Sequence, residues 1–120
     1  MAKSKKTPAK KAAKPPVAKI TKNELVAAAA PHSQPADVQC TFTGGIGQIT
    51  ATLFRKGVMI NMQSISSTGT IPFVEVQTGD AISINGVCSG KALIRISVTT
   101  TPETPQQFAA GIIFAAFLIH

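Results

Sequence analysis

Short runs in residues 37–99 alternate between apolar and polar side chains, and this period limits the fold more than any other feature of the chain. A repeat of two residues is that of a β-strand with one buried face and one solvated face. The segment therefore predicts six strands, and Lys91 and Arg95 lie on the polar side of the last one. The alternating runs are 38–42, 49–53, 58–62, 71–76, 82–84 and 92–98.

Glycine, asparagine and serine separate these runs. Glycine and asparagine tolerate the positive φ that tight hairpin turns require, and connections of two to five residues favour hairpins and meanders over crossover helices. The segment predicts an all-β domain: a small antiparallel sandwich or barrel, jelly-roll-like or immunoglobulin-like. Pro72 cannot donate to a ladder, so it indicates a sheet edge or a strand end. The predicted turns are 44–47, 56–57, 66–69, 79–80, 85–86 and 89–90.

The positive charge of the chain is concentrated in residues 1–22, which contain no acidic residue, whereas residues 23–120 are nearly neutral. This Lys/Ala/Pro segment has too little apolar bulk to fold alone and predicts a disordered basic arm. By composition it resembles the tails of linker histones and the basic arms of viral coat proteins. The resemblance implies contact with nucleic acid or another acidic surface, and a solvated solubility tail is the alternative. The candidate contact residues are Lys3, Lys5, Lys6, Lys10, Lys11, Lys14, Lys19 and Lys22.

A short helix and a linker are predicted in residues 23–36, between the arm and the β domain. Thr21 and Glu24 have the spacing of a capping box, which starts a helix over residues 22–30 that Pro31 ends. The apolar part of this helix is too short for the core of a secretion signal. His32 has no thiol or carboxylate cluster near it in sequence, so we expect a surface histidine and not a metal ligand.

The C-terminal end combines a polar spacer with an uncharged apolar run. Residues 100–107, with two prolines, predict an extended linker. The C-terminal segment of residues 108–120 is apolar over its first twelve residues, 108–119. This run is too short to cross a bilayer as a helix, because twelve residues rise only about 18 Å. It is a last strand buried on both faces, a tail that inserts into a neighbouring subunit, or a membrane-dipping segment. The candidate assembly contacts are Phe108, Ile112, Ile113, Phe114, Phe117, Leu118 and Ile119.

No catalytic motif is present, so we expect no enzyme, cofactor or metal site. The glycines of 44–47 precede a strand-like run and not a helix, which favours a hairpin turn over a phosphate loop. Glu75 and Asp80 are predicted to be a strand-surface acid and a turn-stabilising aspartate, not a catalytic carboxylate pair. Cys40 and Cys88 lack zinc-site spacing, and they are core thiols or a disulfide between the first strand and the fifth.

A basic arm, a neutral β domain and an apolar end together resemble a small capsid, penton, cement or spike-type protein of a virion. The resemblance implies a structural subunit that binds other protein subunits, and nucleic acid through its arm, in the virion or in the cytoplasm before assembly. A membrane contact is a weaker expectation. One alternative is a non-specific nucleic-acid-binding protein that uses the arm. Another is an adhesion or carbohydrate-binding β module, which the absence of Trp and Tyr disfavours.

Overall fold

A computed structural model of the chain describes residues 33–120, and their regular structure consists of β-strands. The basic arm of residues 1–22, the helix predicted over residues 22–30 and His32 lie outside the described residues. The strands are β1 (Ser33–Thr43), β2 (Gly47–Arg55), β3 (Val58–Ile65), β4 (Gly69–Gln77), β5 (Ala81–Cys88), β6 (Lys91–Ile96), β7 (Thr100–Thr101), β8 (Gln106–Phe108) and β9 (Gly111–Ile119).

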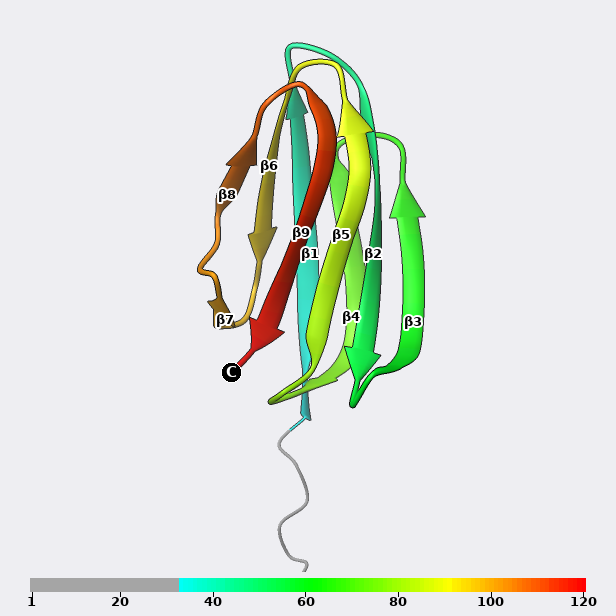
Figure 1. Cartoon of the computed structure of the whole chain (residues 1–120), viewed down its shortest axis with the longest axis vertical. Coiled ribbons are helices and arrows are strands. Elements are labelled where there is room, and N and C mark those ends of the chain that lie inside the picture. The colour runs from blue at the N-terminus through cyan, green and yellow to red at the C-terminus, as the bar shows by residue number, and fades with distance from the viewer. Residues whose placement is uncertain (1–32) are drawn as a thin grey trace, which may run out of the picture. The chain divides into compact units, whose positions relative to one another are not determined.

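Two antiparallel sheets pack together as a sandwich (Figure 1). The four-stranded sheet has the order β4-β1-β6-β8, and the five-stranded sheet has the order β3-β2-β5-β9-β7. The prediction of a small antiparallel all-β sandwich is confirmed at this level. The sandwich is larger than the predicted segment 37–99, because β1 begins within the predicted linker and the last three strands come from residues 100–119.

The core lies between the inner faces of the two sheets. Alternate residues of the long strands other than β3 point inward, as Ile49, Ala51 and Leu53 do on β2, and they form one cluster with residues of the other sheet. The period of two in the sequence predicts these faces correctly on most strands. It is wrong for β3, where Val58, Ile60 and Met62 are exposed although the alternation predicts a buried side. Phe73 and Phe117 have the largest of the fully buried side chains.

Most connections cross from one sheet to the other, and this corrects the prediction of hairpins and meanders. Among the described strands, β2 and β3 are the only consecutive strands that pair with each other. Their turn is Lys56–Gly57, with φ of 53° and 79°, the positive values that a two-residue hairpin requires. A short loop of small residues can also cross from one sheet to the other. The turn residues alone therefore do not distinguish a hairpin within one sheet from a connection between the two sheets.

The predicted turn at Asn85–Gly86 lies in the middle of β5, between β2 and β9. Gly86 is needed there for a different reason. A Cβ at this position would lie 2.0 Å from the carbonyl oxygen of Gln48 and 2.8 Å from the Cα of Ile49. The glycine therefore permits a close approach of two backbones in a strand and does not mark a turn.

Pro72 lies on β4, which is an edge strand of the four-stranded sheet. The predicted sheet edge is thus confirmed. A bulge follows it, because the pairing with β1 shifts by one residue between Gln34 and Ala36. Proline and a bulge together make this edge a poor template for another strand.

Candidate assembly surface

The five-stranded sheet is almost free of charge. Its strands contain a single charged residue, Arg55 at the end of β2. The guanidinium of Arg55 donates two hydrogen bonds to the carboxylate of Asp80, from Nε to Oδ1 at 3.0 Å and from Nη2 to Oδ2 at 2.9 Å. The solvent-facing side of this sheet, called the outer face below, therefore carries no free charge.

Large apolar side chains stand on the outer face. On β9, Ile112 is 84% exposed and Phe114 is 73% exposed. The strand register places apolar residues side by side at the two ends of β9, because Ile112 pairs with Val87 and Leu118 pairs with Ala81. Between them, Phe114 pairs with Asn85 and Ala116 pairs with Ser83, which are polar but uncharged. The exposed large apolar residues of β3, β5 and β9 that border or lie on this face are Val58, Met59, Met62, Val87, Ile112, Phe114 and Leu118.

The opposite sheet has the ordinary surface of a protein in water. Asp37 on β1, Glu75 on β4, and Lys91 and Arg95 on β6 are all exposed. One sheet face without charge that exposes several large apolar side chains, opposite a face with exposed charges, is the asymmetry expected of a protein–protein contact. The outer face is therefore the candidate functional site of the described residues.

The structure divides the predicted assembly residues of 108–119 into two groups. Ile112, Phe114 and Leu118 are exposed on the outer face, and Phe108 is half-buried on β8 against the core. The buried residues cannot contact a second subunit while the sandwich is folded. They are Ile113, Phe117 and Ile119.

The apolar run is therefore neither buried on both faces nor a free tail. As β9 it pairs with β5 along its whole length and fills the core with one face only. Residues 100–107, predicted as an extended linker, contain β7 and the first residues of β8 and run along the same sandwich. The part of the chain that the structure describes contains no helix able to cross a membrane.

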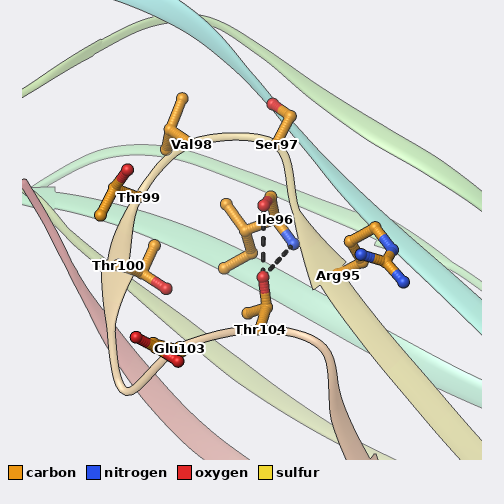
Figure 2. A pocket seen from close by; sticks show the side chains of 8 residues that line it. All are labelled: Arg95, Ile96, Ser97, Val98, Thr99, Thr100, Glu103 and Thr104. Carbon is orange, nitrogen blue, oxygen red and sulfur yellow. Dashed lines mark hydrogen bonds between the residues drawn. The ribbon is translucent and has the colours of Figure 1, made fainter.

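A hollow of about 480 Å³ lies where the chain leaves β6, lined by residues 95–100 with Glu103 and Thr104 (Figure 2). Thr104 closes one side, since its Oγ1 accepts a hydrogen bond from the N–H of Ile96 at 3.1 Å and donates one to the carbonyl oxygen of Ile96 at 3.3 Å. Arg95 and Glu103 lie on opposite sides of Thr104 in Figure 2. Among the residues that line the hollow, Arg95 and Glu103 are the charged ones, and none is a histidine or a cysteine.

The glycine-rich turn 44–47 packs against the turn between β5 and β6. The N–H of Ile46 donates to Oγ of Ser89 at 2.9 Å, and the N–H of Ser89 donates to the carbonyl oxygen of Ile46 at 2.8 Å. The glycines are followed by a strand, as the sequence predicts. The predicted hairpin is wrong, because β1 and β2 lie in different sheets. Within residues 33–120 no group of three His, Cys, Asp or Glu side chains could hold a metal ion.

Cys40 and Cys88 are free, buried thiols on opposite sheets. The thiol of Cys88 donates to the carbonyl oxygen of Ala109 at 3.4 Å. Burial, together with a smaller electrostatic effect of the nearby Cys88, raises the pKa of Cys40 from 9.0 to about 11. Both side chains fill the core, as the core-thiol interpretation expects.

We expect the free energy of unfolding to fall as the pH rises from 9 to 11. The unfolded thiol of Cys40 loses its proton near pH 9, whereas the folded thiol keeps it up to about pH 11, so deprotonation favours the unfolded chain. The loss is about 2 kcal/mol. Urea unfolding at pH 8, 9.5 and 11 measures it, and Cys40→Ala is the control that lacks this slope. Equal slopes for the two proteins would assign the pH dependence to other groups.

Comparison of this chain with protein-family models, with curated proteins and with solved structures gives no match. The case for a function therefore depends on the outer face and on the charge distribution of the chain.

Proposed function

We propose that this protein is a non-enzymatic assembly subunit whose outer face packs against other protein subunits. The observation that carries the proposal is the contrast between the two sheets: one has exposed charges, and the other exposes Ile112 and Phe114 with no free charge beside them. Covering such a face removes apolar area from water at no cost of charge desolvation. A face built for solvent alone would carry Lys, Glu or Asp on its strands.

A structural protein of a virion is the kind of subunit that fits best. Apart from β7, each sheet has four strands, in the orders β4-β1-β6-β8 and β3-β2-β5-β9. These orders support a circularly permuted jelly roll. The two strands that come first along the chain of an ordinary jelly roll correspond here to β8 and β9, which come after the other six. The start of β1 and the end of β9 lie at the same end of the sandwich (Figure 1), as such a permutation requires. Jelly rolls are common in viral capsids, and this support is an analogy of fold.

The charge distribution supports a second contact for the same subunit. The eight lysines of residues 1–22 give the chain its net positive charge, while the described sandwich keeps its few cations on the four-stranded sheet, on turns or in the pair with Asp80. A segment of this composition binds phosphate backbones with little dependence on sequence. The arm would then contact nucleic acid or acidic surfaces of neighbouring subunits, while the outer face makes the apolar contacts.

Two exposed valines on opposite sheets allow a matched test. Val87 is 53% exposed on the outer face, and Val74 is 85% exposed on β4 of the other sheet. We expect the wild-type chain to form larger species as its concentration rises, and Val87→Lys to shift them to monomer, because a lysine on this face would have to lose its water in the contact. Val74→Lys should assemble like the wild type.

Sedimentation velocity at high salt, up to concentrations on the order of 100 μM, measures both variants against the wild type. High salt removes association that runs through the basic arm. A wild-type chain that stays monomeric throughout, or two valine variants that behave alike, would contradict the proposed function.

A further inference from the structure

The sandwich has several strand edges, and all but one carry a feature that discourages pairing. Edge strands expose unpaired backbone groups, so proteins protect them with proline, bulges, charge or short length. β4 has Pro72 and a bulge, and β3 has a bulge where its pairing with β2 shifts after Leu53. The side-chain Nε2 of Gln63 on β3 also donates to the carbonyl oxygen of Pro72, at 2.7 Å. β7 and β8 contain only two and three residues.

β9 is the exception. It has nine residues, no proline and no charge, and its register with β5 is unbroken from Gly111 to Leu118. On its other side only β7 pairs with it, at Leu118 and Ile119. Figure 1 shows β9 as the last long strand of its sheet. Residues 111–117 therefore have an edge to which no described strand is paired.

The hydrogen bonds at the end of β9 define which backbone groups point to this edge. The N–H of Ile119 donates to the carbonyl oxygen of Asp80 at 2.8 Å, on the β5 side, whereas the N–H of His120 donates to the carbonyl oxygen of Thr99 at 3.0 Å, on the β7 side. Backbone groups alternate in direction along an antiparallel strand. The even-numbered residues Ile112, Phe114 and Ala116 therefore direct their N–H and C=O groups to the open edge.

From this arrangement we infer that the open edge of β9 pairs antiparallel with β9 of a second copy of this chain. The inference rests on the proposed assembly role and names its partner and contact. In a two-fold contact a surface must complement itself. With Phe114 opposite Phe114, Ile112 of each copy faces Ala116 of the other, and all six open groups form hydrogen bonds.

A second copy fits this edge better than an unrelated charged segment would. Both edges lack charge, so no like-charge contact opposes the pairing. The pairing also puts the outer faces of the two copies on the same side, because hydrogen-bonded partners in a sheet project their side chains together. Two five-stranded sheets then form one continuous sheet whose apolar face is twice as wide.

Cysteine cross-linking of the full-length chain tests the register. Opposite residues in a hydrogen-bonded pair have Cα atoms about 5.5 Å apart, which is within the range of a disulfide. With oxidised glutathione, which is reduced to two glutathione thiols as each disulfide forms, Phe114→Cys should yield a covalent dimer. Ile112→Cys is the matched control, since its two copies would lie roughly 13 Å apart in this register. A mixture of Ile112→Cys and Ala116→Cys chains should cross-link to each other. Cys40 and Cys88 are buried and should contribute little.

Ala116→Pro tests the pairing without a thiol. The N–H of Ala116 points to the open edge, so proline removes no bond to β5 but blocks a partner strand. We expect loss of the dimer in sedimentation, with Ala116→Thr, which keeps the N–H, dimerising like the wild type. Circular dichroism checks that both variants fold.

The outcomes separate this inference from the proposed function. Larger species that depend on Val87 but give no Phe114→Cys dimer, or equal cross-linking of Phe114→Cys and Ile112→Cys, would overturn edge pairing and leave the assembly role standing. A chain that is monomeric under all conditions would overturn both.

Discussion

Asp80→Ala is expected to lower the free energy of unfolding by about 3 kcal/mol, because it breaks a buried ion pair from its more buried side. The carboxylate of Asp80 is 1% exposed and accepts three hydrogen bonds. Two come from Arg55 at the end of β2, and the third comes from the N–H of Gln77 at 2.8 Å. This one side chain thus joins the turn between β4 and β5 to the end of β2, and alanine leaves all three donors without their acceptor.

Urea unfolding of Asp80→Ala, Arg55→Ala and the double variant measures how much of this loss depends on the pair. We expect the double variant to be little less stable than Asp80→Ala, because the partner is already lost. Glu75→Ala is the control, since this exposed carboxylate accepts one hydrogen bond, from Oγ of Ser33, and acts on Arg55 only through a weaker charge attraction. Its removal should cost less than about 0.5 kcal/mol. Additive losses for Asp80 and Arg55 would show that the pair contributes little.

The ion pair also illustrates what the sequence could and could not predict. The position of Asp80 after Gly79 indicates a turn-stabilising aspartate, and the bond to Gln77 fits that role. Its partner Arg55 lies 25 residues earlier. Nothing in the local pattern brings the two together, because their contact depends on which strands become neighbours in the five-stranded sheet.

The same reason explains the errors in connectivity. A period of two identifies the buried side of β2 or β6 correctly, since burial of alternate residues is the same whether a strand continues into a hairpin or arches to the other sheet. Gly86 indicates a turn in the sequence because glycine permits positive φ, yet in the structure it is required by the approach of Gln48 and Ile49 from β2. Close packing between distant strands is invisible in a single segment.

For a related reason, the sequence predicts that the C-terminal segment makes apolar contacts but not which of its residues lie on the outer face. The uncharged run in 108–119 indicates apolar contacts, but a continuous apolar run gives no alternation from which to assign faces. Only the pairing of β9 with β5 separates Phe117, which points into the core, from Phe114, which points to the outer face. The sequence already shows that the segments of β3, β5 and β9 contain no charged residue. Only the structure shows that these strands share a sheet with β2 and therefore form one uncharged surface.

Phe117→Ala should therefore lower the free energy of unfolding by about 4 kcal/mol, because it removes a fully buried ring and leaves a cavity in its place. Phe114→Ala, three residues earlier on the same strand, is the matched control. Its side chain is 73% exposed, so its removal should change stability by less than about 1 kcal/mol.

Assembly should respond in the opposite order. At a pH and temperature where both variants are folded, Phe114→Ala should weaken the larger species seen in sedimentation, whereas Phe117→Ala should assemble once folded, since its side chain never reaches the outer face. Guanidinium unfolding and sedimentation velocity on the same samples measure the two effects. If Phe117→Ala weakened assembly as much as Phe114→Ala without unfolding, the contact would depend on the shape of the whole sandwich. Apolar contacts of the outer face through Phe114 would then be insufficient to explain it.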